Sequence, residues 1–346
     1  MFQYLNLAVL KFSFICFIIF LSSCKQKSEV EIPNVSHINS QLNLVRFDLE
    51  LQNKSTDLLI KSYPAFADLY FRQIISICDS IQDPELNKNV QEFLKDTIIK
   101  NINLKVENKF GDFEKIEKEL RQSLQYFKYY FPSKPEPKFY TFISEFGYGN
   151  FIFQDENKRD GIGIGLDFFL GDLVNYSKLD PKNPAFSNYL TRTFNSNYLC
   201  KKSWECWIDD LLTEPAQQQF LDFLIHRGKK QYLLRALLPE EQDSILFEFR
   251  SEQMDWCKKN EMEIWSFFMD SNLLYSTESS KFSKYINPSP NSPGMPEVAP
   301  GRTACFIGYK IVKNYMEKTK SSMVDLLSEN NSQVILEKSR YKPKNL

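Results

Sequence analysis

Histidine is the side chain most often used to bind catalytic metals and to move protons near neutral pH, and it is scarce in this sequence. Only His37 and His226 occur, and there is no HExxH motif or cysteine–histidine cluster at metal-ligand spacing. His226 follows an apolar segment and precedes Arg227, so we interpret it as a residue at the end of a helix. The sequence therefore predicts no metal site and no cofactor.

Three glycines alternate with apolar residues at positions Gly161, Gly163 and Gly165. A dinucleotide-binding fingerprint places its third glycine three residues after the second, at a turn between a strand and a helix. Here that position is Leu166, and the alternation is typical of a strand. We therefore expect no nucleotide there, and interpret the glycines as positions where another backbone or side chain approaches closely.

Carboxylate pairs are the remaining candidates for acid–base chemistry. Asp167 and Asp172 flank a short apolar stretch of the sequence. A glycosidase needs two carboxyl groups about 5–9 Å apart across a cleft, and sequence alone does not fix that separation. A quarter of the chain is charged, so roles on a solvated surface or at a helix cap are the competing interpretation.

The N-terminal residues carry a second chemical signal. An apolar run over residues 12–21 is shorter than the roughly 20 residues that a transmembrane helix needs. It ends in the string Leu-Ser-Ser-Cys at Cys24, which looks like the lipobox of bacterial lipoproteins. We therefore predict a signal peptide over residues 1–23 and lipidation of Cys24, so that acyl chains such as palmitate anchor the chain in a bilayer.

Composition constrains the organisation of the chain beyond the anchor. Residues 24–42 are polar with mixed charge, which predicts a tether, and residues 43–346 are long enough for one large globular domain. The 43 basic and 44 acidic residues give a net charge of −1, so nucleic acid is not an expected partner. Five cysteines remain after the leader and the anchor, so at least one stays unpaired within the chain: Cys78, Cys200, Cys206, Cys257 and Cys305.

Hydrophobic periodicity predicts an α+β fold that is mainly helical, with a small antiparallel sheet. Alternation over residues 45–51 predicts a strand, whereas apolar residues at steps of three and four predict a helix over residues 112–130. Strands at 150–153 and 161–168 are expected to form a hairpin with a long loop. Pro215 marks an expected helix start, and further expected elements are a strand at 139–143, helices at 204–211, 239–257, 261–274 and from 304 onward, and a proline-rich loop at 285–302.

Several strings, in this order, resemble the gliding motility lipoprotein GldB family of Bacteroidota. They are Tyr129-Tyr-Phe-Pro132, residues 163–172, Gly228-Lys-Lys-Gln-Tyr232 with Leu238-Pro239, Trp256 with Asn260-Glu261 and Ile264-Trp265, Pro300-Gly-Arg302 leading into residues 306–316, and residues 339–343. The resemblance implies a role in gliding motility and in protein secretion to the cell surface, without a reaction. It also implies a distant similarity to zinc-peptidase scaffolds; because residues 204–225 contain no histidine, the scaffold would lack its metal ligands.

These observations leave two hypotheses about function. The first is a non-enzymatic, lipid-anchored envelope protein whose globular part lies in the periplasm and binds other proteins of the gliding or secretion machinery. Its expected contact surfaces are the loop 285–302, which ends at Arg302, and the basic run 227–230, expected to be exposed. The alternative is a cryptic envelope hydrolase, peptidase- or glycosidase-like, that uses the carboxylates of Asp167 and Asp172.

Overall fold

The computed structural model describes residues 32–215 and 218–344. Residues Val35–Leu346 form one compact unit. Val35 is buried in its core, and Ile38 and Leu42 pack against that core. The last part of the segment expected to be a tether therefore contacts the folded unit.

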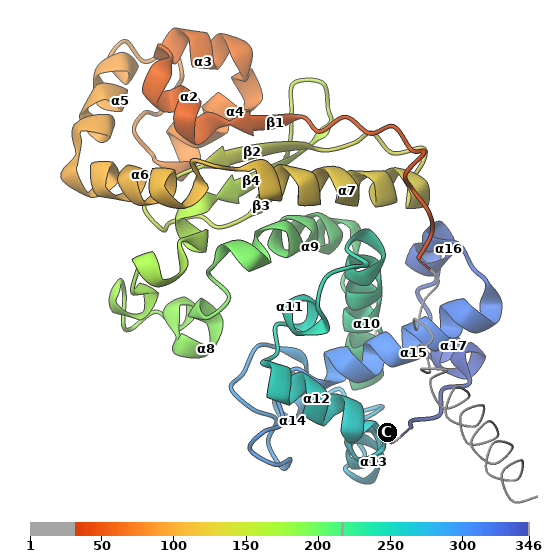
Figure 1. The fold of residues 1–346 in the computed structure, drawn as a ribbon. Coiled ribbons are helices and arrows are strands. Elements are labelled where there is room, and N and C mark those ends of the chain that lie inside the picture. The colour runs from red at the N-terminus through yellow and green to blue at the C-terminus, as the bar shows by residue number, and fades with distance from the viewer. Residues whose placement is uncertain (1–31, 216–217, 345–346) are drawn as a thin grey trace, which may run out of the picture. The chain divides into compact units, whose positions relative to one another are not determined.

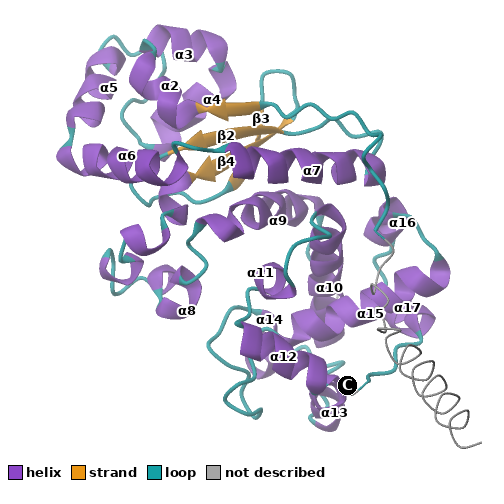
Figure 2. Cartoon of the chain, in the orientation of Figure 1, coloured by secondary structure: helices purple, strands orange, loops and turns teal. Residues whose placement is uncertain are grey.

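In the described residues, four strands form one sheet in the order β1-β2-β4-β3 (Figure 2). The strands are β1 (Leu44–Arg46), β2 (Lys138–Phe142), β3 (Phe151–Gln154) and β4 (Asp160–Gly165). The expected hairpin is confirmed, because β3 and β4 pair antiparallel. However, β1 pairs with β2, and β2 with β4, in parallel, so the prediction of an antiparallel sheet is wrong. Parallel pairs need long crossover connections, and the helices between β1 and β2 supply one of them.

The predicted strand over residues 45–51 is also wrong beyond its first residues. Strand β1 ends at Arg46, and helix α2 (Phe47–Asn53) begins at once. Phe47 and Leu51 are both buried, and they are four residues apart, so the same apolar pattern fits one face of a helix. Alternation of apolar residues over so short a segment does not distinguish the two-residue period of a strand from the 3.6-residue period of a helix.

Each face of the sheet contacts its own hydrophobic core. Tyr140 and Phe142 of β2 belong to a small aromatic cluster with the N-terminal helices, whereas Phe139 of the same strand belongs to the larger core. Figure 1 shows helices α2 to α5 on one side of the sheet and helices α7 and α9 on the other. The helices before β2 are α3 (Thr56–Ser62), α4 (Pro64–Leu69), α5 (Leu86–Lys95), α6 (Thr97–Phe110) and α7 (Glu114–Tyr130).

The alternating glycines of β4 make room for aromatic rings of β3. A Cβ added at Gly161 would lie 2.4 Å from the ring of Phe153, and one at Gly163 would lie 2.4 Å from that of Phe151. The interpretation of close approach is therefore confirmed. Any larger residue at either position would push these rings out of their places beside the aromatic cluster.

The chain after β4 is helical. Its helices are α8 (Asn188–Thr191), α9 (Leu199–Leu211), α10 (Phe220–Leu237), α11 (Asp243–Phe247), α12 (Ser251–Lys259), α13 (Glu261–Asp270), α14 (Ser279–Ile286), α15 (Thr303–Thr319), α16 (Met323–Ser328) and α17 (Ser332–Ser339). The expected helix at 239–257 is two helices, because Glu248 adopts a left-handed conformation with φ +54° that ends α11. Helix α10 begins at Phe220 and not near Pro215.

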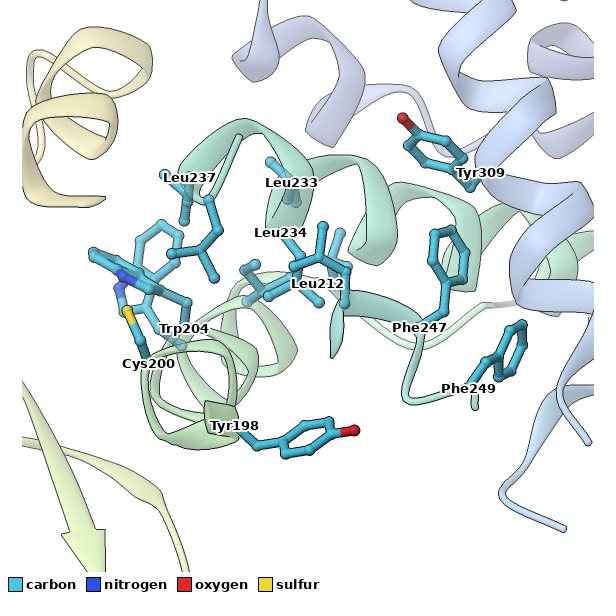
Figure 3. Packing of buried hydrophobic residues seen from close by; sticks show 14 of the residues in the cluster. Tyr198, Cys200, Trp204, Leu212, Leu233, Leu234, Leu237, Phe247, Phe249 and Tyr309 are labelled. Carbon is cyan, nitrogen blue, oxygen red and sulfur yellow. The ribbon is translucent and has the colours of Figure 1, made fainter. Parts of the chain in front are cut away.

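Helices α10 and α15 cross at glycines. A Cβ on Gly228 would lie 2.3 Å from backbone atoms of Gly308, and one on Gly308 would lie 2.0 Å from the carbonyl oxygen of Leu224. Figure 3 shows the core beside this crossing, where Trp204 of α9 faces Leu233, Leu234 and Leu237 of α10. None of the helices in the described residues combines the length and apolar character that a membrane span requires.

Candidate functional site

Asp167 lies in a closed cradle of backbone donors. It follows β4 in a short 3₁₀ helix (Leu166–Phe169), and it is 0% exposed. Its Oδ2 accepts hydrogen bonds from the backbone N–H of Ser144 at 3.1 Å and of Phe146 at 2.7 Å, and from the Ser144 hydroxyl at 3.3 Å. The loop can point these donors at one oxygen because Glu145 and Phe146 have left-handed backbones, with φ of +55° and +62°.

This environment changes the acidity of Asp167. Burial raises its pKa to about 6, although the hydrogen bonds from Phe146 and Ser144 act to lower it. All three donors are neutral groups. Tyr176 holds the same turn from the other side, donating from its hydroxyl to the Asp167 carbonyl at 2.6 Å. Asp167 therefore has the contacts of a residue that fixes a loop.

Asp172 does not join Asp167 in a catalytic pair. It is exposed, and it lines a polar surface cavity of about 620 Å³ with Lys109, Asn195 and Arg192. Among the described residues, Asp172 is the one carboxylate that lines this cavity. A two-carboxylate hydrolysis mechanism needs both groups at one accessible cleft, so the geometry gives no support to the hydrolase hypothesis.

Arg302 takes part in a different and larger site, which we name the buried ion cluster: Lys201, Lys202, Glu205, Lys230, Glu248 and Arg302. At its centre, the Glu248 carboxylate is 2.7 Å from Lys201, 2.5 Å from Lys202 and 3.0 Å from Arg302. Glu205 is 2.7 Å from Lys201 and 2.9 Å from Lys230. The Lys201 side chain is 0% exposed and that of Glu248 is 4% exposed.

Four helices supply these charges. Lys201, Lys202 and Glu205 lie on α9, Lys230 lies on α10, Glu248 ends α11, and Arg302 precedes α15. Figure 3 shows Phe247 and Phe249, the apolar neighbours of Glu248 in the chain. Both Glu248 and Arg302 have left-handed backbones, with φ of +54° and +63°. Such conformations are uncommon for residues other than glycine, so the surrounding packing must hold them in place.

The neighbouring cations keep the two carboxylates of the cluster ionised. Burial acts to raise the pKa of Glu248, but attraction to Lys201, Lys202 and Arg302 outweighs it and holds that pKa well below its ordinary value. At Glu205 burial also acts to raise the pKa, and attraction to Lys201 and Lys230 outweighs it and lowers that pKa. Neither carboxyl group is poised to exchange a proton near neutral pH. Burial acts in the opposite sense on Lys201 and lowers the pKa of its ammonium group.

Sequence reasoning identified Arg302 and missed the rest of the cluster. Lys201 and Glu205 are four residues apart, a spacing usual on a solvated helix surface. The useful signal was Glu248, a charged residue between Phe247 and Phe249, because an acid among large apolar residues is often buried with a cation.

The basic run 227–230 is not an exposed surface, so that prediction is wrong. Lys229 is 7% exposed and donates to the Glu329 carbonyl at 2.6 Å, and Lys230 pairs with Glu205 and Asp209. His226 is not a helix-end residue either, because α10 continues to Leu237. A helix packed on most sides buries its charged residues along with its apolar ones.

A family model described as gliding motility protein GldB matches residues 28–343 of the chain. The chain belongs to the GldB family. A comparison with curated proteins and one with solved structures each found no match. The expectation of a zinc-peptidase-like scaffold therefore stays a prediction.

The described sites of this GldB-family chain hold buried carboxylates in two ways, by neutral hydrogen-bond donors at Asp167 and by ion pairs at Glu248. No group of three His, Cys, Asp or Glu side chains in the described part of the chain could hold a metal ion. The five cysteines of the globular part are free in the structure. Cys24, the predicted lipidation site, lies outside the described residues.

Proposed function

We propose that this chain is a lipid-anchored, non-catalytic component of the gliding motility machinery that acts by binding other envelope proteins and supports secretion to the cell surface. The observation that carries the proposal is the GldB family match over residues 28–343. Acylated Cys24 anchors the chain in the inner or outer membrane, and the globular part lies in the periplasm.

Three features support a binding role over catalysis. The two carboxylates considered for hydrolysis lie in separate environments, because Asp167 is buried and Asp172 is exposed. The charges of the buried ion cluster are held by mutual ion pairs. The proline-rich loop is fixed in place, because Tyr285 donates to the Pro293 carbonyl at 2.7 Å and Ser292 to the Pro300 carbonyl at 2.6 Å. A preorganised surface loop loses little entropy on binding a partner.

The test begins with a chromosomal deletion scored for colony spreading and for surface secretion. We expect the deletion to abolish spreading and the wild-type gene to restore it. The variant Cys24→Ala removes the acceptor of the lipid, so we expect no spreading and no incorporation of labelled palmitate.

The matched control is Cys78→Ala, which removes a partly buried free thiol and leaves the anchor intact. Cells with this variant should spread normally. Normal spreading of the deletion strain would reject the motility proposal. Normal spreading of Cys24→Ala cells, together with unacylated protein, would reject the anchor alone.

A further inference from the structure

A small cavity lies beside the buried ion cluster, between α8, the start of α12 and the proline-rich loop. Its volume is about 270 Å³, and we name it the arginine cavity because Arg192, Arg250 and Arg302 line it. The loop closes one wall tightly, since a Cβ on Gly301 would lie 2.2 Å from the carbonyl oxygen of Ser289. Ser289 in turn donates to the Lys284 carbonyl at 2.9 Å.

Positive charge exceeds negative charge in this cavity. Glu248 is the one carboxylate among the described lining residues, and Lys201 and Lys202 share it with Arg302. Arg192 donates to the Glu248 backbone carbonyl but forms no ion pair with a carboxylate in the described residues. Burial lowers the pKa of Arg192; attraction to Tyr198 and Glu248 acts against this effect, and repulsion from Arg302 and Arg250 adds to it.

Two helices add to the positive potential. Arg250 is the residue before the first turn of α12, and Arg302 is the residue before the first turn of α15. A helix N-terminus carries a partial positive charge from its unpaired N–H groups. The first turn of α15 contains no acidic residue that would neutralise this charge, whereas the first turn of α12 contains Glu252.

The remaining walls are largely apolar. Tyr189, Leu190 and Phe249 line the cavity together with Pro288, Pro290 and Pro300. The volume lies just below the range of about 300–1,000 Å³ typical of small-molecule sites, so one or two side chains fit better than a cofactor. Guanidinium groups match the planar geometry of a carboxylate, with two parallel hydrogen bonds.

We propose that the arginine cavity binds an aspartate or glutamate side chain from an acidic peptide segment of a partner protein. Within the described parts of the chain, Arg192 forms no ion pair with a carboxylate, and Arg250 forms one, with the exposed Glu252. The proline and aromatic walls contact the peptide on either side. This inference rests on the proposed function, in which the chain acts through protein contacts, and it names the chemistry of the contact.

The test measures binding of a fluorescein-labelled octaglutamate peptide to the full-length protein in detergent, by fluorescence anisotropy at a fixed salt concentration. We expect saturable binding to the wild type. Arg250→Gln, at an exposed side chain, should weaken it several-fold, and the double variant Arg192→Gln/Arg250→Gln by about tenfold, the change that 1.4 kcal/mol produces. Arg121→Gln makes the same single charge change as Arg250→Gln at an exposed site that does not line the cavity, and should bind like the wild type.

Thermal unfolding by circular dichroism confirms that each variant is folded. Equal loss of binding in Arg121→Gln and in the double variant would overturn the proposal, since it would show bulk attraction. Absence of octaglutamate binding would also overturn it, as would displacement of bound peptide by millimolar inorganic phosphate, which would assign the cavity to phosphate groups. If the protein does not bind the peptide but colony spreading still depends on Cys24, this inference is rejected and the proposed function stands.

Discussion

Two buried carboxylates of this protein, those of Asp167 and Glu248, differ in how their surroundings satisfy them. Asp167 sits among neutral donors, and burial raises its pKa to about 6. Glu248 is buried almost as deeply, yet three cations surround it and its pKa is held far below the ordinary value. The surroundings therefore disfavour the ionised carboxylate at Asp167 and favour it at Glu248.

The difference shows that burial alone does not decide whether a charge stabilises a fold. Hydrogen bonds from neutral groups offset only part of the desolvation of Asp167, whereas nearby full charges reverse that penalty at Glu248. Replacing each acid by its amide should therefore have different consequences for stability, and this substitution tests the comparison directly.

The largest effect is expected for Glu248→Gln. The variant leaves Lys201, Lys202 and Arg302 without their shared carboxylate, and the Lys201 side chain is 0% exposed, so water cannot replace it. Removing one partner of a buried ion pair typically costs about 3–5 kcal/mol. We expect a loss of that size in the free energy of unfolding, measured by urea titration with tryptophan fluorescence.

The control for this prediction is Glu252→Gln. Glu252 pairs with Arg250 at 3.2 Å, but both side chains are more than half exposed. An exposed pair contributes roughly 0–1 kcal/mol, so this variant should unfold almost like the wild type. Similar losses in both variants would mean that the buried ion cluster does not stabilise the fold more than a surface pair.

A smaller and opposite trend is expected for Asp167→Asn. The amide oxygen can accept from Ser144 and Phe146 in place of Oδ2, while the charge is removed. The folded-state pKa of about 6 lies above the ordinary value of 3.8, so the folded wild type binds more protons between these values and loses stability as pH rises through them. The asparagine variant lacks this loss.

The stability of Asp167→Asn relative to the wild type should therefore increase between pH 4 and pH 7, by up to about 3 kcal/mol. Urea titrations of both proteins across that range measure the trend. A constant difference would show that Asp167 has an ordinary pKa in the folded protein, and the contrast with Glu248 would then disappear.

Local patterns allowed part of this fold to be predicted from sequence. The helix expected at 112–130 is α7 (Glu114–Tyr130), and its apolar positions Leu120, Leu124 and Phe127 are buried as their spacing indicated. The expected strands at 139–143 and 150–153 are also present, as β2 and β3. Each of these elements has a regular spacing of apolar residues along its own segment, and that spacing is what periodicity detects.

Long-range pairings could not be predicted in the same way. Strand β1 pairs with β2, with Leu44 beside Phe139. Six α-helices separate the two strands along the chain, and local patterns do not show how these helices are arranged in space. The ion pair between Lys201 and Glu248 joins α9 to the end of α11, and neither residue lies in a motif. Arg302 stood out because it ends a proline-rich loop, but its partners depend on how four helices pack.

The smallest effect is expected for Ser144→Ala, which tests which donors hold Asp167. The Ser144 hydroxyl is 3.3 Å from Oδ2, farther than the backbone N–H groups of Ser144 and Phe146. The same hydroxyl also accepts from the Tyr148 N–H at 3.0 Å. Because the variant keeps both backbone donors to the carboxylate and removes the hydroxyl's contacts with Asp167 and Tyr148, we expect a loss of about 1–2 kcal/mol in the free energy of unfolding, at about 1 kcal/mol for each hydrogen bond. Urea titration at pH 7 measures it. A loss as large as that of Glu248→Gln would show that the hydroxyl, and not the left-handed loop backbone, holds this carboxylate in place.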